Sequence, residues 1–236
     1  MSEDKIYPVQ AGAKENTHIT DEQYQQMYRA SIEQPEDFWS EQASAFLSWS
    51  KPWTNLMTSD MSQGKSAWFE GGQLNASVNC IDRHLAKRAE QTAIIWEGDD
   101  PKDSRHITYQ ELHDEVCRFA NVLKSHGVKK GDSVTIYMPM VPEAIEAMLA
   151  CARIGAIHSV VFAGFSAKAL ADRINDATCN MVICSDYNNR GAKHIPVKEV
   201  VDEAMEIGCP SIETILVHKN TGDEVTWNER DVWWHD

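Results

Sequence analysis

Two short segments of the sequence combine residue types that suit an anionic ligand. The first is the run Phe162-Ala163-Gly164-Phe165-Ser166, whose small residues let the backbone approach a ligand closely. Ser166 is a candidate N-cap, so the helix that follows would present unpaired backbone N–H groups to an anion. A tight strand-to-helix turn, with Gly164 at a positive φ, explains the same residues, and composition alone leaves both interpretations open.

The second segment is basic in a chain that is otherwise strongly acidic. Residues 187–198 contain no Asp or Glu but carry Arg190, Lys193 and Lys198, whereas the whole chain has a formal net charge of -14. Such a loop is typical of an anion site, although a solvated surface loop has the same composition. If both segments follow parallel strands, they lie at the same edge of a sheet, and we expect one shared site.

Alternating strand and helix signals surround both segments. Thr108-x-x-Glu111 is a capping box that opens a helix ended by Gly127, and Pro142 and Gly155 mark the ends of the next helix. Strands are predicted at 92–96, near 107, and at 133–138, 157–162, 181–184 and 213–217, with a further helix at 196–206. This alternation predicts an α/β fold, a doubly wound and largely parallel sheet with right-handed crossovers and helices on both faces.

The N-terminal third has a different character. Thr20-x-x-Gln23 is a capping box and Pro35 precedes two acidic residues, which predicts two short helices. A stretch of poor periodicity then contains four tryptophans, Trp39, Trp49, Trp53 and Trp68. We interpret residues 1–76 as a helical and irregular arm that packs on an α/β subdomain of residues 77–236.

Composition disfavours several classes of function. With 42% hydrophobic residues the chain can build a core, and its negative charge disfavours nucleic acid and anionic membranes as partners. Residues 1–5 are polar with no apolar segment behind them, and no run reaches the roughly 18 apolar residues of a membrane span, so we expect a cytoplasmic protein. The six cysteines form no C-x-x-C pair and mostly lie in apolar runs, so we expect reduced thiols.

Motifs for other chemistries are incomplete or missing. Gly64-Lys65-Ser66 imitates the end of a P-loop, but Ser59 stands where a glycine is required and no strand is predicted before it. The nine histidines never fall in an H-x-x-x-H pattern and no Cys/His set has zinc spacing, so no metal site is predicted. The G-x-G-x-x-G motif is absent, which leaves a Rossmann dinucleotide site without support.

Three phrases of the sequence resemble those of a known family. Residues 68–75 (WFEGGQLN) lead into residues 79–85 (NCIDRHL), residues 153–166 read RIGAIHSVVFAGFS, and residues 190–196 read RGAKHIP. They resemble the lead segment and the two coenzyme A loops of AMP-forming acetyl-CoA synthetases, within the adenylate-forming acyl-CoA synthetase superfamily. The resemblance continues to DVWW at 231–234 and covers essentially the whole chain, as the N-terminal portion of such an enzyme.

The resemblance implies a ligase that works in two steps. Acetate attacks the α-phosphate of Mg-ATP to give acetyl-AMP and pyrophosphate, and the thiol of coenzyme A then displaces AMP. The implied substrates are acetate, ATP and coenzyme A, with Mg²⁺ as the metal cofactor. In relatives the ATP-phosphate loop, the acetate pocket, the metal ligands and the catalytic lysine lie further along than Asp236. No catalytic residue is therefore assigned, and the chain alone is expected to be inactive.

The resemblance also implies a coenzyme A site. Its residues in this sequence are Phe162, Ala163, Gly164, Arg190, Gly191, Ala192 and Lys193. The first three match the segment that lines the adenine end of coenzyme A, and the two basic residues match the positions that meet its 3′-phosphate. Lys193 stands where a second arginine is common, and lysine keeps the charge but loses bidentate geometry. Ala163 likewise stands where glycine is common.

Two alternative functions stay open. A propionyl-CoA synthetase or another short-chain acyl-CoA synthetase would share these motifs, because acyl specificity depends on a pocket beyond this segment. A doubly wound chain could also act as a non-catalytic module that binds coenzyme A or a nucleotide.

Overall fold

The computed structural model describes residues 7–100 and 102–235, and the chain divides into two compact units, Met1–Leu74 and Asn75–Asp236. The polar run at 1–5 lies outside the described residues. Within the described ranges, every helix is too short or too polar to cross a membrane.

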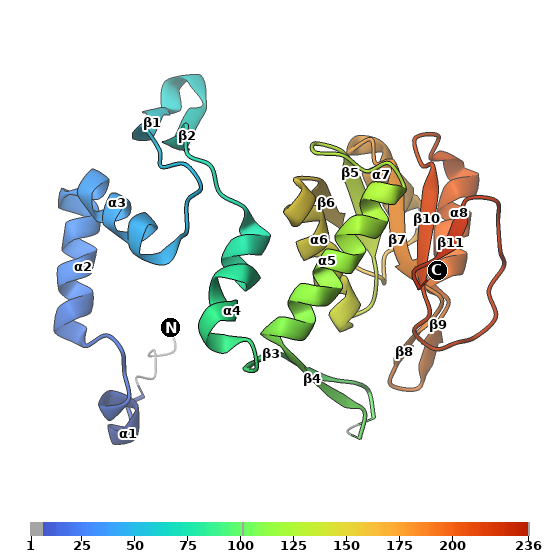
Figure 1. The fold of residues 1–236 in the computed structure, drawn as a ribbon, viewed down its shortest axis with the longest axis horizontal. Helices are drawn as coiled ribbons and strands as arrows, with labels where there is room; N and C mark the ends of the chain where they lie inside the picture. The colour runs from blue at the N-terminus through green and yellow to red at the C-terminus, as the bar shows by residue number, and fades with distance from the viewer. Residues whose placement is uncertain (1–6, 101, 236) are drawn as a thin grey trace, which may run out of the picture. The chain divides into compact units, whose positions relative to one another are not determined.

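Among its described residues, the N-terminal unit holds three α-helices and one antiparallel hairpin (Figure 1). Its elements are α1 (Ala11–Glu15), α2 (Asp21–Glu33), α3 (Pro35–Phe46), β1 (Asn55–Asp60) and β2 (Lys65–Glu70). The capping box before α2 is confirmed, because Thr20 Oγ1 accepts the Gln23 N–H at 3.3 Å and the Gln23 side chain accepts the Thr20 N–H at 2.8 Å. The start of α3 at Pro35 is confirmed as well.

The β1–β2 hairpin is the main departure from the expected helical and irregular arm. Gly64 follows a 3₁₀ turn (Met61–Gln63) and closes the hairpin with a φ of 62°. The prediction that no strand precedes this Gly-Lys-Ser segment is wrong. The segment is still no P-loop, because a strand and not a helix follows it. Aromatic rings pack together in this unit, with centroids 4.9 Å apart for Trp49 and Trp53 and 5.2 Å apart for Trp53 and Phe69.

The C-terminal unit is built on a five-stranded parallel sheet in the order β11-β10-β7-β5-β6. Its strands are β5 (Ser133–Tyr137), β6 (Ile157–Val160), β7 (Met181–Ser185), β10 (Thr214–His218) and β11 (Asp231–Trp233). Its helices are a π-helical turn (Val78–Asp82), α4 (Arg83–Arg88), α5 (Tyr109–Ser125), α6 (Pro142–Ile154), α7 (Ala167–Asp176) and α8 (Val197–Gly208). The predicted α/β class and parallel sheet are confirmed.

Two antiparallel hairpins lie outside this sheet. They are β3 (Thr92–Glu97) with β4 (Ser104–Thr108), and β8 (Asn188–Arg190) with β9 (Lys193–Ile195). The strands predicted at 92–96 and near 107 therefore exist, but they pair with each other and do not join the parallel sheet.

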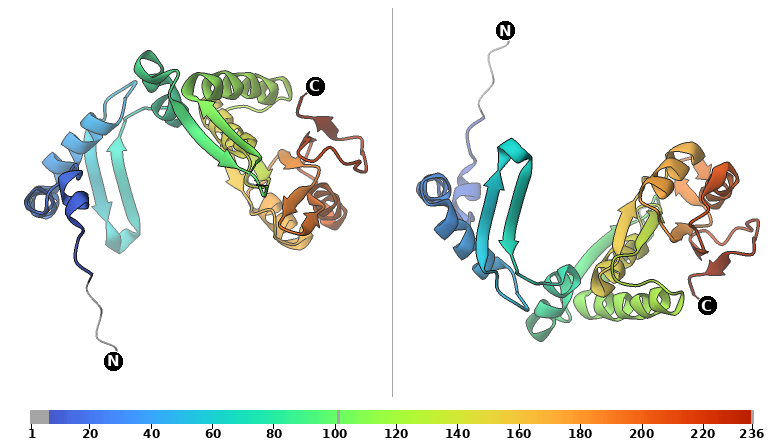
Figure 2. Two further views of the ribbon diagram at one scale, coloured as in Figure 1. Left: turned by 90° about the horizontal axis from the view of Figure 1, so that it is seen from below. Right: turned by 90° about the horizontal axis from the view of Figure 1, so that it is seen from above.

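Helices cover both faces of the sheet, so it is doubly wound as predicted. Along β7, Met181 and Ile183 pack with residues of α5 and α6, whereas Val182 and Cys184 pack with residues of α7 and α8. Figure 2 shows the green helix α5 on one side of the sheet and the orange helix α8 on the other. Because both faces are buried, β7 is apolar along nearly its whole length.

The helix ends follow the predicted signals. α5 begins at a complete capping box between Thr108 and Glu111. α6 has Pro142 in its first turn and ends at Gly155, which takes a φ of 77°. The hydroxyl of Ser166 caps α7. These caps fix the points at which the chain enters and leaves the sheet.

The two adjacent tryptophans near the C-terminus lie at the end of the edge strand β11, with Trp233 inside it and Trp234 directly after it. Trp233 in β11 stacks on Trp227 with ring centroids 4.4 Å apart. Trp234 stacks on Phe119 of α5 with centroids 3.6 Å apart. The two indoles thus cover opposite faces of the sheet, as the alternation of a strand requires.

Candidate functional site

The strand order places a crevice between β5 and β7. β5 lies between β6 and β7. Helix α6, which connects β5 to β6, covers one face of the sheet, and helix α7, which connects β6 to β7, covers the other. The connections therefore diverge at this point. In open α/β sheets, ligands bind at such a switch point, beyond the carboxyl ends of the strands.

A cavity of about 610 Å³ lies at these strand ends. Four segments that follow parallel strands line it, namely 138–141 after β5, 162–163 after β6, 188–191 after β7 and 220–221 after β10. Ile195 of β9 and, from the β3–β4 hairpin, residues 96–100 and Asp103 complete the lining. Figure 1 shows the β3–β4 and β8–β9 hairpins at the same lower edge of this unit.

The structure brings the two predicted segments to this one cavity. Phe162 and Ala163 of the first segment and Arg190 and Gly191 of the second all line it. The remaining predicted residues adjoin these in sequence but do not line the cavity: Gly164, Ala192 and Lys193. The expected shared edge of the sheet is therefore present, while the part that each residue plays in ligand binding stays a prediction.

Tyr137, at the end of β5, holds the first segment in place. This side chain is buried, and its hydroxyl donates a hydrogen bond to the carbonyl oxygen of Phe165 at 2.8 Å. Burial raises the pKa of the Tyr137 hydroxyl, so the group stays protonated and can donate. The expected positive φ of Gly164 is wrong. A Cβ at this position would lie 2.5 Å from Cε1 of Phe162, so the Phe162 ring would have to move if another residue replaced Gly164.

The second segment is a short hairpin and not an open loop. Gly191 takes a φ of 59° at the turn between β8 and β9. The rings of Tyr187 and His194 stack with centroids 4.5 Å apart, and His194 Nδ1 lies 2.8 Å from Asn189 Oδ1. Arg190 is exposed, and its guanidinium has no ion pair or hydrogen bond among the described residues. It is therefore available to an anionic group.

Lys198 does not belong to the basic surface that the sequence suggests. Its side chain is 1% exposed and forms ion pairs with Asp202 at 2.6 Å and with Asp231 at 2.9 Å. Burial opposes its charge, but the two carboxylates outweigh burial and raise the pKa of Lys198. This ion-pair triad links α8 to β11. The predicted anion site therefore keeps only Arg190 and Lys193 of its three cations.

One wall of the cavity is acidic, which the charge pattern of the two segments did not predict. Four residues of the β3–β4 hairpin carry it: Glu97, Asp99, Asp100 and Asp103. Only the tertiary contacts show that these residues reach the cavity. The segments after β5 and β10 were missed as well. Applying the strand-end rule to every predicted strand would have found them.

Metal binding and catalysis by the buried thiols Cys151 and Cys184 find no support among the described residues. Within residues 7–100 and 102–235, no group of three or more His, Cys, Asp or Glu side chains is arranged to hold a metal ion. Burial raises the pKa of Cys151 to about 12 and also raises that of Cys184, so neither thiol is a reactive nucleophile.

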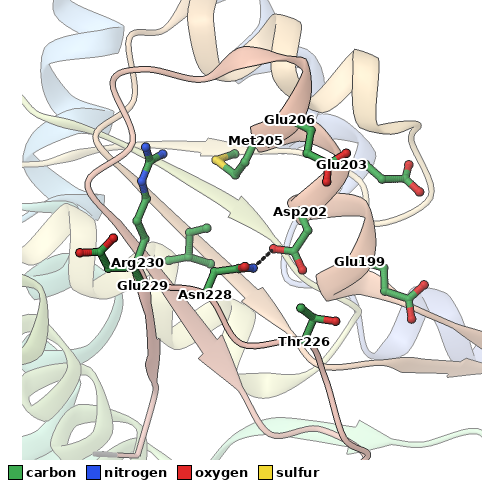
Figure 3. A pocket seen from close by; sticks show the side chains of 10 residues that line it. Glu199, Asp202, Glu203, Met205, Glu206, Thr226, Asn228, Glu229 and Arg230 are labelled. Carbon is green, nitrogen blue, oxygen red and sulfur yellow. Dashed lines mark hydrogen bonds between the residues drawn. The ribbon is translucent and has the colours of Figure 1, made fainter.

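A second cavity, of about 500 Å³, lies between α8 and the segment before β11. Figure 3 shows the carboxylates that surround it and the hydrogen bond from Asn228 Nδ2 to Asp202 Oδ1, at 2.9 Å. Its acidic lining residues are Glu199, Asp202, Glu203, Glu206 and Glu229, and its basic lining residue is Arg230. Such a lining repels anions, so the cavity at the strand ends is the better candidate for an anionic ligand.

The chain matches two family models that together cover most of its length. Residues 81–235 match the model of AMP-binding enzymes, and residues 24–80 match that of the acetyl-coenzyme A synthetase N-terminus. The chain therefore belongs to the family of AMP-binding enzymes.

Its curated relatives are much longer proteins. The chain is 54% identical to acetyl-coenzyme A synthetase 2 of Pseudomonas aeruginosa and 55% identical to acetyl-coenzyme A synthetase 2 of Pseudomonas putida, over 100% of its own length. It spans only 37% and 36% of those two relatives, respectively. Acetoacetyl-CoA synthetase from Streptomyces lividans has the same fold, with a TM-score of 0.81 at 24% identity over 96% of this chain and 34% of that one.

Proposed function

We propose that this chain is the coenzyme A-binding part of an AMP-forming acetate–CoA ligase. In this reaction a carboxylate oxygen of acetate attacks the α-phosphorus of ATP, acetyl-AMP forms and pyrophosphate leaves. The thiol of coenzyme A then loses its proton and attacks the acetyl carbonyl, and AMP leaves. The two family models and the names of the relatives support this assignment.

ATP and Mg²⁺ are the expected partners of acetate in the first step. The described residues supply no cluster of metal ligands, so we assign neither the metal nor the ATP phosphates to side chains of this chain. The strongly negative net charge fits a cytoplasmic enzyme that acts on small molecules and binds neither nucleic acid nor anionic membranes.

The observation that carries the proposal is that Phe162, Ala163, Arg190 and Gly191 line one cavity at the switch point of the sheet. The nucleotide end of coenzyme A joins a flat adenine ring to phosphate groups. Phe162 is 57% exposed, so its ring can stack on an adenine, and the guanidinium of Arg190 can donate to a phosphate. Carboxylates of the acidic wall can accept hydrogen bonds from the adenine amine or from ribose hydroxyls.

The test is a calorimetric titration of the full-length protein with coenzyme A and with 3′-dephospho-coenzyme A. Arg190 and Lys193 are expected to contact only the 3′-phosphate, so coenzyme A should bind about ten- to a hundredfold more tightly, since a hydrogen bond between charged groups contributes about 1.5 to 3 kcal/mol. Equal affinities would contradict the site.

Catalysis requires a separate test. The full-length protein should exchange pyrophosphate into ATP when acetate is present, and competition between acetate and propionate would establish the acyl preference. We expect no acetate-dependent AMP formation from residues 1–236 alone. If the full-length protein bound coenzyme A but supported no exchange with any short-chain acid, a non-catalytic binding module would be the correct interpretation.

A further inference from the structure

A buried carboxylate joins two of the segments that line the cavity. Asp186 follows β7 directly and is 0% exposed. Its carboxylate accepts backbone N–H groups from Tyr187 at 2.6 Å, Asn220 at 2.9 Å, Thr221 at 3.1 Å and Gly222 at 2.8 Å. Three of these donors belong to the turn after β10 and one to the chain that leads into β8.

The backbone of Asp186 makes two further connections. Its N–H donates to the carbonyl oxygen of His218 at 3.0 Å, and its carbonyl oxygen accepts the N–H of Lys198 at 3.0 Å. The residue therefore joins the end of β10, the start of α8 and the entry to the β8–β9 hairpin.

The donors around Asp186 are backbone groups and not cations. Among the described residues, no lysine or arginine side chain pairs with it. Backbone N–H groups that converge on a carboxylate satisfy its acceptor oxygens and fix its position. A carboxylate has two acceptor oxygens, whereas an asparagine would direct an NH₂ group at backbone donors. An asparagine would therefore leave some of these backbone donors without an acceptor.

We propose that Asp186 is a positioning residue of the coenzyme A site, and this inference rests on the proposed function. Asp186 holds the turn at 220–222 against the entry to the β8–β9 hairpin. Asn220, Thr221 and Arg190 therefore line the same cavity. Asp186 itself does not line the cavity and acts only through these segments.

A second contact between the same two segments supports the inference. Asn220 Nδ2 donates a hydrogen bond to the carbonyl oxygen of Tyr187 at 2.9 Å. Asn220 is half-buried, so removing its side chain disturbs the core far less than changing Asp186. The variant Asn220→Ala therefore weakens the same connection in a protein that is expected to fold.

The test uses the full-length protein and the variants Asp186→Asn and Asn220→Ala. Asp186→Asn should raise KM for coenzyme A by about ten- to a hundredfold, because small misplacements of binding groups have effects of that size. Asn220→Ala should raise it about two- to tenfold, as expected for the loss of one hydrogen bond. In both variants the preference for coenzyme A over 3′-dephospho-coenzyme A should shrink, while acetate-dependent ATP–pyrophosphate exchange stays unchanged.

Asp172→Asn serves as the control, because Asp172 is an exposed carboxylate on α7 whose only ion-pair partner among the described residues is Lys168. It should leave both substrate preference and exchange unchanged. The inference is overturned if both variants keep the wild-type preference for coenzyme A, or if binding and exchange decline together as in general unfolding. If Asp186→Asn does not fold, Asn220→Ala decides alone. A wild-type protein that shows no preference for coenzyme A would instead refute the proposed function.

Discussion

Asp99 accepts a hydrogen bond from the backbone N–H of Gly191 at 2.6 Å, across a sequence separation of 92 residues. This contact joins the tips of two hairpins, β3–β4 and β8–β9, that both lie outside the parallel sheet. It also places a carboxylate next to Arg190, the cation expected to meet the 3′-phosphate of coenzyme A. The carboxylate of Asp99 thus holds the tip of the β8–β9 hairpin beside the place where the 3′-phosphate should bind.

Replacing Asp99 with asparagine should strengthen the binding of coenzyme A. Asparagine keeps an acceptor oxygen for the Gly191 N–H and removes one negative charge from an exposed part of the cavity. Exposed charges of this kind contribute up to about 1 kcal/mol, so the affinity should rise about two- to fivefold and the difference should fade at high salt. Calorimetry at two salt concentrations measures this effect. Weaker binding would mean that the contact is needed chiefly to shape the hairpin.

Arg190→Ala should raise KM for coenzyme A by about ten- to a hundredfold, because it removes a charged hydrogen-bond donor of the phosphate. Acetate-dependent ATP–pyrophosphate exchange should not change, since coenzyme A takes no part in that step. Arg190→Lys should have a KM for coenzyme A between those of the wild type and Arg190→Ala, because lysine keeps the charge without the bidentate geometry. Lys168→Ala on α7 is a suitable control for loss of an exposed cation. A parallel fall in exchange would argue against this assignment.

Gly164→Ala should weaken binding of coenzyme A with little loss of stability. The new Cβ would lie 2.5 Å from the ring of Phe162, and Phe162 is 57% exposed, so its ring is free to swing aside. We expect the free energy of unfolding to change by less than about 1 kcal/mol, and the affinity to fall about three- to tenfold as the cavity wall moves. In a Phe162→Ala background the same change should have no further effect. An equal loss in both backgrounds would show that the ring is not the cause.

Glu146→Gln should stabilise the protein in a pH-dependent manner. Burial, together with the nearby carboxylates Glu143 and Glu115, raises the pKa of Glu146 to about 7 from an ordinary value of 4.5. The folded state of the wild type thus binds this proton more tightly than the unfolded state does. The stability that the bound proton gives the wild type is complete below about pH 4.5 and is lost as the pH rises to about 7. At pH 8 the variant should exceed the wild type by roughly 1 to 3 kcal/mol.

Urea unfolding at pH 5 and pH 8 tests this prediction. The gain should be large at pH 8 and small at pH 5, while Glu213→Gln, at an exposed position, should show no such difference. An equal gain at both pH values would mean that packing, and not the ionisation of Glu146, is responsible.

The sequence by itself determined most helices and strands of the α/β unit and their order, although it did not predict β8, β9 or β11. Thr108, Pro142, Gly155 and Ser166 act through groups within a few residues of themselves, so their effects on helix ends can be read locally. The apolar run of β7 likewise reports burial on both faces wherever the strand is placed. These local signals were sufficient to predict a doubly wound sheet and two strand-end segments near its edge.

Only the tertiary structure decided which charges face the cavity. Lys198 and Arg190 belong to one basic run of the sequence, yet one is buried between Asp202 and Asp231 and the other is exposed. Asp99 of the β3–β4 hairpin lines the cavity and accepts a hydrogen bond from Gly191, which is 92 positions away in the sequence. The interaction between two charges depends on their distance in three dimensions, and the spacing of residues along the chain does not show which charges will lie close together.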